Sequence, residues 1–237
     1  MQSLFAVFAL GLAMLGLEQA RPARSFDRVA HWWSRAIALT AVQAAIGLIA
    51  VATCDRWLPG LALWKVGGYG ILADAALGYV VLTFVYYWWH RARHQIPFLW
   101  RWLHRLHHSA CRIELITSFY KHPAEIIANA LISALIVYVL LGLTPESAAV
   151  VATVSGFAEL FYHWNVRTPH WLGFLVQRPE SHCVHHQRGR HTNNFADLPL
   201  WDMVFGTFEN PREAPRKCGF GPELEQRLPD LLLWRIE

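Results

Sequence analysis

Long runs of apolar residues, separated by short polar segments, fill the first two thirds of the chain. Apolar runs of this length predict helices that cross a membrane. We predict four or five such spans, at about residues 3–17, 36–53, 71–89, 124–143 and 146–162. Several runs are shorter than the roughly 20 residues that a perpendicular span needs, so some could form hairpins or lie partly in the interface. Pro145, between the last two runs, favours a tight turn and hence an antiparallel helix pair.

The composition agrees with a membrane protein. Of the 237 residues, 54% are hydrophobic and 16% are charged, whereas charged residues make up about 25% of an ordinary soluble domain. Basic residues near anionic headgroups explain the net charge of +4, so we predict no nucleic-acid partner. The first apolar run could also be a signal peptide, but the residues before it lack Lys and Arg, and we expect a retained span.

Basic residues between the runs orient the predicted bundle. Arg21, Arg24, Arg28 and Arg35 lie between the first two runs, and Arg91, Arg93, Arg101, Arg105, Arg112 and Lys121 lie between the third and the fourth. By the positive-inside rule these two segments face the cytoplasm, and so does the segment from His163 onward. The pattern therefore predicts an integral membrane protein, of the bacterial inner-membrane type or equivalent, with its histidines on the cytoplasmic face.

Histidines are concentrated in one part of the chain, since twelve of the thirteen lie between His90 and His191. Eight of them form three clusters: His90 and His94; His104, His107 and His108; His182, His185 and His186. Helix residues three and four apart project from one face, so each cluster predicts a set of rings presented together. A metal site needs several neutral imidazoles at one point. The repeated spacing favours such a site over a merely histidine-rich tract, whereas the isolated His31 is predicted to have no such role.

The number of donors indicates two metal ions. Nine or ten imidazoles exceed the four to six donors that one ion binds, and imidazole alone does not choose among iron, zinc and copper. The chain lacks the His-Glu-x-x-His motif of zinc metalloproteases and the Glu-x-x-His pairs of soluble di-iron oxygenases. Its four cysteines have no spacing typical of iron–sulfur clusters or of a disulfide framework.

The order of these motifs resembles the fatty acid hydroxylase / sterol desaturase superfamily of integral-membrane di-iron enzymes. After the clusters come Asn193-Asn194-Phe195 and then Trp-Asp-Met-Val-Phe-Gly-Thr-Phe at residues 201–208. The likeness covers about residues 78–211. It implies an all-α membrane bundle of four or five spans with a dimetal site. It also implies three parts: N-terminal membrane helices (1–67), a catalytic domain (68–211) and a C-terminal cytoplasmic tail (212–237).

The resemblance implies nine metal ligands, namely His90, His94, His104, His107, His108, His163, His182, His185 and His186. Four further residues are possible ligands or neighbours of ligands: His122, Asn165, Glu180 and Asp202. For His122 an equally weighted alternative is that it begins a membrane helix, with Glu125 complementing the helix dipole. His170 and His191 are expected beside the ligands or on the surface.

Two positions depart from the family's pattern and leave the tenth ligand open. Thr83 stands where many relatives carry an acidic residue, and Arg167 stands where some carry a second histidine after the one matching His163. One metal could therefore be completed by His122, Asn165 or water.

The resemblance further implies oxidation of a lipid. Two iron ions (Fe2+/Fe3+) and O2 would oxidise an unactivated C–H bond of a fatty acyl, amino-lipid or sterol-like substrate. We favour hydroxylation, with desaturation by the same site as the alternative. No haem, flavin or nicotinamide motif is present, so a separate reductase or electron carrier is implied. Other interpretations are a membrane zinc hydrolase, a metal carrier without redox chemistry and a non-catalytic lipid-binding relative. The oligomeric state is not predicted.

Overall fold

The computed structural model describes residues 2–235 and, within them, the side chains from residue 7 onward. Within this range the regular structure is helical, apart from one isolated β-bridge between Gln187 and Cys218. The long helices are α1 (Gln2–Ala20), α2 (Trp32–Trp57), α3 (Ile71–Gln95), α6 (Pro123–Ala134) continued by η4 (Leu135–Leu140), and α7 (Pro145–His163). The short ones are η1 (Pro59–Leu61), α4 (Pro97–Leu99), η2 (Trp100–His104), α5 (Arg105–Ser109), η3 (Leu115–Phe119), η5 (His170–Phe174), α8 (Pro179–His185), α9 (Pro199–Val204), α10 (Pro222–Glu225) and α11 (Leu228–Leu232).

Three helices in the described part of the chain are long and apolar enough to cross a membrane. They are Trp32–Trp57, Ile71–Gln95 and Pro123–Leu140, which correspond to the second, third and fourth predicted spans. The first predicted span coincides with α1, of which Val7–Ala20 is a shorter apolar helix, and the fifth coincides with α7, which is not among the three. The all-α membrane fold is confirmed, whereas the number of spans and the face turned to the cytoplasm stay predictions.

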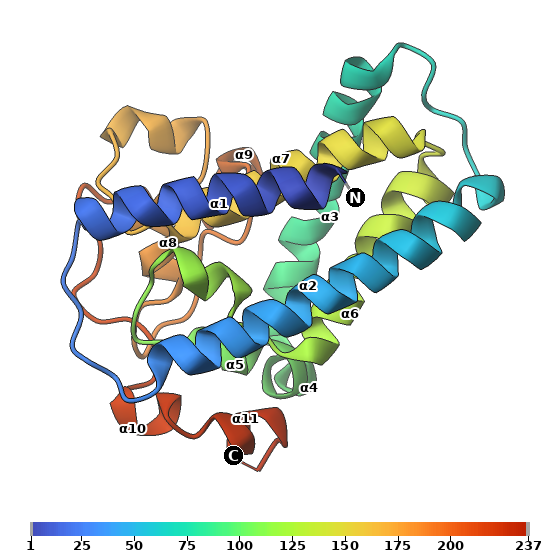
Figure 1. Ribbon diagram of the computed structural model, residues 1–237. Coiled ribbons are helices and arrows are strands. Elements are labelled where there is room, and N and C mark those ends of the chain that lie inside the picture. The colour runs from blue at the N-terminus through green and yellow to red at the C-terminus, as the bar shows by residue number, and fades with distance from the viewer. Residues whose placement is uncertain (1, 236–237) are drawn as a thin grey trace.

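The helices pack in two pairs on opposite sides of the molecule. The helix α1 lies along α7, and α2 lies along α6 (Figure 1). The helix α7 also packs against α3. The turn predicted at Pro145 is present: Gly142 has φ +63°, Thr144 caps α7 by accepting a hydrogen bond from Ser147 N, and Pro145 is the first helical residue. However, α6 and α7 do not form the predicted antiparallel pair as their main contact. The helix α6 packs mainly against α2, and α7 packs mainly against α1 and α3, while a cavity lies between α6 and α7.

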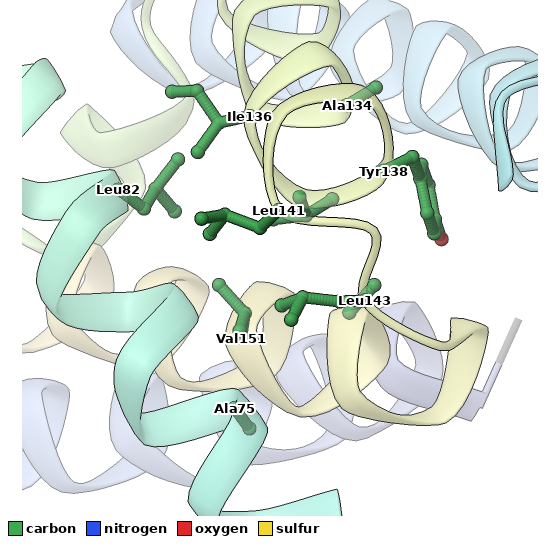
Figure 2. Packing of buried hydrophobic residues seen from close by; sticks show 10 residues of the cluster. Ala75, Leu82, Ala134, Ile136, Tyr138, Leu141, Leu143 and Val151 are labelled. Carbon is green, nitrogen blue, oxygen red and sulfur yellow. The ribbon is translucent and has the colours of Figure 1, made fainter. Parts of the chain in front are cut away.

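A buried apolar cluster joins α3, η4 and α7 (Figure 2). Leu82 comes from α3, Ile136 and Leu141 come from η4 and the turn after it, and Val151 comes from α7. Gly78 allows the closest approach, since a Cβ there would lie 2.6 Å from Leu143 Cδ1. This cluster fixes the relative positions of the helices that carry the histidines, because α3 and α7 continue from it to His90 and His163.

Candidate metal centre

All nine histidines predicted as ligands converge in two groups. The first group, which we call group I, consists of His90, His94, His104, His108 and His185; group II consists of His107, His163, His182 and His186. Within each group the candidate ligand atoms lie within 4.8 Å of one another. Group I thus offers five donor atoms and group II offers four, and each number suits one ion.

Each His-x-x-His-His cluster is divided between the groups, which corrects the prediction that a cluster presents its rings together. His104 and His108 belong to group I and His107 to group II, whereas His182 and His186 belong to group II and His185 to group I. Residues four apart lie about 40° apart around a helix, but neighbouring residues lie about 100° apart, so the middle ring points elsewhere. The middle histidine of each cluster therefore belongs to the group formed mainly by the other cluster, so each cluster contributes rings to both groups.

Local helix geometry places these rings. His104 lies at the end of the π-helix η2, and the α-helix α5, which carries His107 and His108, follows directly. Single π-helical turns are rare and often occur at functional sites. His163 is the last residue of α7, and His182 and His185 lie on α8.

The distances between ring nitrogens fit metal coordination. Two donors that are bound at right angles, each about 2.1 Å from an ion, lie about 3.0 Å apart. In group I, His104 Nε2 lies 2.9 Å from His90 Nε2 and 3.1 Å from His108 Nε2. In group II, His182 Nε2 lies 3.1 Å from His163 Nε2 and 3.0 Å from His186 Nε2.

Unpartnered nitrogens support the same conclusion. The Nε2 atoms of His94 and His185 are buried and have no hydrogen-bond partner among the described residues. A buried polar atom without a partner costs free energy, roughly 1–3 kcal/mol. The residues present therefore fit two metal ions.

Backbone carbonyls orient two rings of group I. His90 Nδ1 lies 2.7 Å from Phe195 O, and His185 Nδ1 lies 2.7 Å from Asn193 O. Asn193 and Asn194 adopt left-handed backbone conformations, with φ +68° and +50°, which asparagine tolerates better than most residues. This geometry explains the Asn-Asn-Phe motif, since it turns the carbonyls of Asn193 and Phe195, the first and third residues of the motif, toward the histidines.

Asp202 holds that loop in place. Its carboxylate accepts hydrogen bonds from Phe195 N, Ala196 N and the Thr207 hydroxyl. Burial raises the pKa of Asp202 to about 6, and these hydrogen bonds oppose the rise. Asp202 was predicted to orient a ligand ring directly, but it acts one step further out, through the loop that contacts His90.

A carboxylate that the sequence interpretation assigned differently contacts group I directly. Glu125 Oε1 lies 2.8 Å from His104 Nδ1 and also pairs with Arg93, and the Glu125 side chain is fully buried. We expected Glu125 to complement the dipole of α6. Its position inside the site depends on how the start of α6 packs against the end of η2, which local sequence spacing does not express.

Group II has fewer such supports. His163 Nδ1 lies 2.9 Å from Glu159 O, His107 Nδ1 lies 3.3 Å from Tyr120 O, and the Gln177 amide lies 3.0 Å from His182 Nδ1. His186 Nδ1 is buried and has no partner among the described residues.

Burial keeps the imidazoles neutral. It holds the pKa well below the usual value in His104, His107, His108, His182 and His186, and neighbouring charged groups lower it further. Burial lowers the pKa of His185 to about 3, although its hydrogen bond to Asn193 acts in the opposite direction. Neutral imidazole is the form that binds metal.

Comparison with known proteins agrees with this geometry. The family model for fatty acid hydroxylase matches residues 75–207. The chain belongs to the fatty acid hydroxylase family. It is 30% identical over 200 residues to the very-long-chain aldehyde decarbonylase GL1-5 of Oryza sativa. The aligned region covers 77% of this chain and 30% of that protein. It is also 30% identical over 224 residues to the ornithine lipid hydroxylase OlsE of Rhizobium tropici, covering 88% of this chain and 66% of that one.

The human alkylglycerol monooxygenase is 31% identical over 140 residues, which cover 56% of this chain and 30% of that protein. The chain spans less than a third of the length of two of the curated relatives it matches, the decarbonylase GL1-5 and the protein CER1-like 1 of Arabidopsis thaliana. No solved structure matches it.

The other residues singled out in this fatty acid hydroxylase family member lie outside the two groups. His122 caps α6 by accepting a hydrogen bond from Ala124 N, which supports the helix-start alternative. Asn165 exchanges hydrogen bonds with the backbone of Arg24, and Glu180 accepts from Thr168 and pairs with Arg178. His170 contacts Asn210 O. The predicted roles of His122, Asn165 and Glu180 beside a metal are therefore not supported by their positions.

Three positions that were left open are also resolved. Thr83 is buried and accepts a hydrogen bond from Trp201 Nε1, whereas Arg167 is exposed. The Nδ1 atom of His191 lies 3.1 Å from that of His108. His191 is thus a direct neighbour of group I.

A cavity of about 370 Å3 leads from the histidines into the helical bundle. Rings of both groups line one end of it, and side chains from α2, α3, α6 and α7 form its walls. Most of the wall surface is apolar, but the lining also includes the ion pairs of Arg93 with Glu125 and of Lys121 with Glu159 and uncharged polar side chains such as Asn129. The volume lies within the range of roughly 300–1,000 Å3 typical of ligand sites.

Proposed function

We propose that this chain is an O2-dependent di-iron oxidoreductase that hydroxylates an unactivated C–H bond of a membrane lipid. The observation that carries the proposal is that two histidine groups lie at one end of an apolar cavity inside a membrane-type bundle. When bound, two iron ions would supply the redox chemistry, with O2 as co-substrate and electrons from a separate reductase or carrier.

The roles of the chain's own residues follow from their positions. The nine histidines of groups I and II hold the metals, and Glu125 and the 193–195 loop keep the ring nitrogens aimed at them. The apolar walls bind the lipid chain and keep water away from the reacting carbon. Residues 68–211 form the catalytic part, between the N-terminal membrane helices (1–67) and the tail (212–237), and the site faces the cytoplasm.

The names of relatives support a lipid substrate. They include an ornithine lipid hydroxylase, an alkylglycerol monooxygenase and the sphingolipid C4-hydroxylase sur2 of Schizosaccharomyces pombe. Desaturation by the same site is the second candidate, because both reactions begin with hydrogen removal from carbon.

The test is lipid analysis of cells with and without the gene, grown with full aeration and with limited oxygen. A lipid that gains one oxygen atom, only with the gene and only with oxygen, supports hydroxylation; one that loses two hydrogen atoms supports desaturation. Purified protein should contain two iron ions per chain. Redox-silent zinc and no altered lipid, even after reconstitution with iron, would contradict the proposal and favour a hydrolase or metal carrier.

A further inference from the structure

One end of the cavity lies far from the histidines. Its lining there consists of Cys54 and Asp55 from the last turn of α2, Tyr138 from the π-helix η4, and Ala148 from the start of α7. Tyr138 is 3% exposed, and its hydroxyl donates a hydrogen bond of 2.8 Å to Asp55 Oδ1. This contact joins α2, which lies outside the region matched by the family model, to a helix inside it.

The segment after α2 covers the same end. Leu63 N donates to Val139 O, and Val66 N donates to Leu141 O, so carbonyls at the end of η4 and just after it accept hydrogen bonds from this segment. Leu58 and Val66 pack against the cluster that contains Tyr138. The hydrogen bonds and the packing hold the Tyr138 ring in one position.

The distance from the histidines to this end of the cavity suits one long acyl or alkyl chain. On α7 the lining runs from His163 back to Ala148, which at 1.5 Å per residue is about 22 Å along the helix axis. Small and apolar side chains, including Ala134, Val137 and Val151, line much of the wall toward this end. A cavity of this length with such a lining fits a single acyl or alkyl chain whose methyl end points away from the histidines.

We propose that Tyr138, positioned by Asp55, is the stop against which the methyl end of a single lipid chain rests, so that it sets how many carbons lie between that end and the oxidised position. This inference rests on the proposed lipid oxidation. Tyr138 and Asp55 are positioning residues, because neither reaches the metals. Selectivity for chain length follows, since one methylene that does not fit an apolar pocket lowers kcat/KM roughly 10-fold or more.

The experiment measures, by mass spectrometry with fragmentation, the number of carbons between the oxidised position and the terminal methyl group in products from membranes that contain the full-length protein. Tyr138→Ala should shift this number upward, because the chain can enter further. Ala148→Leu, which narrows the end and leaves the Tyr138 contact intact, should shift it downward. Asp55→Ala should broaden the distribution, and Asp55→Asn, which keeps an acceptor, should restore it.

Matched controls make the same changes outside the cavity wall. Tyr69→Ala alters an exposed tyrosine, and Ala149→Leu alters the neighbour of Ala148; both should leave the distribution unchanged. An unchanged distribution in both Tyr138→Ala and Ala148→Leu would overturn the stop, and so would a broad distribution in the unmodified protein. If Tyr138→Ala yields no product, the test rests on Ala148→Leu: a downward shift supports the stop, and an unchanged distribution overturns it. Absence of any oxygen-dependent product from the unmodified protein would instead refute the proposed function.

Discussion

Groups I and II are built from the same side chain but differ in support. Group I has five histidines, and its outer nitrogens contact Glu125, the carbonyls of Asn193 and Phe195, and His191. Group II has four histidines; three of them contact only uncharged carbonyl or amide groups through their outer nitrogens, and His186 Nδ1 has no partner among the described residues. Partners of this kind fix the orientation of ligand rings and raise metal affinity. We therefore expect group I to hold its metal more tightly than group II.

The two groups also differ in what they face. Three members of group II, His107, His163 and His182, line the cavity, compared with His90 and His104 from group I. The group with fewer donors is thus the one that contributes more rings to the cavity wall. A site that keeps a position open for a reactant needs fewer protein ligands than a purely structural site.

The largest effect is expected from a change in group II. His107→Ala leaves three histidine donors, so metal content should fall from two ions toward one per chain and lipid oxidation should be lost. Membrane insertion should persist, because His107 acts as a ligand and not through packing. Metal analysis and product formation are measured on the same preparation. Retention of two ions and of normal activity would remove the second cluster from the site.

The matched change in group I should be milder. His94→Ala leaves four donors, the number that group II has in the unmodified protein. We expect both ions to remain at saturating metal, with weaker binding in a chelator titration. If His94→Ala loses its metal more readily than His107→Ala does, the ranking of the two groups is wrong.

The support around group I can be tested without removing a ligand. Glu125→Gln keeps a hydrogen-bond acceptor for His104 but removes the charge that pairs with Arg93. Loss of an outer partner lowers metal affinity or activity roughly 10- to 100-fold, so Glu125→Ala should reach that range and Glu125→Gln should fall between it and the unmodified protein. Metal should be lost from group I alone. Equal loss from both groups would show that Glu125 acts through folding.

Acid should weaken the metal-free protein, because the histidine pKa values are lowered on folding. Between pH 6.5 and the folded pKa of about 3 for His185, the unfolded chain binds a proton that the folded chain does not. At pH 5 this single residue costs about 2 kcal/mol of folding free energy, and stability is fully present only above pH 6.5. Thermal unfolding of metal-free protein at pH 7.5 and pH 5 measures the effect. If the midpoint temperature of unfolding is the same at pH 7.5 and pH 5, the histidine rings already bind protons at pH 5 in the folded state.

The sequence predicts the membrane helices and the eight clustered histidines because both are expressed in local spacing, whereas His163 was predicted only through the family resemblance. Ranges such as 71–89 follow from hydropathy, and His90 and His94 lie one turn apart on one helix. It does not predict the assignment of His107 and His185 to opposite groups, because that depends on how η2, α5 and α8 face each other. The contact of Glu125 with His104 and the action of Asp202 through a loop were likewise missed, since both arise from tertiary packing between segments distant in the chain.

The smallest effect separates a ring that caps a helix from rings that bind metal. His122 and His31 occupy the same position before α6 and α2, but only His122 accepts a hydrogen bond through its side chain, from Ala124 N. His122→Ala should lower the free energy of unfolding by about 1 kcal/mol, the usual cost of losing such a cap, with two metal ions still bound. His31→Ala is the matched control and should be nearly silent. Denaturant titration gives the first quantity and metal analysis the second. Loss of metal in His122→Ala would return this residue to the site, and loss specifically of the group II ion would give that group a fifth donor and erase the difference in donor number between the two groups.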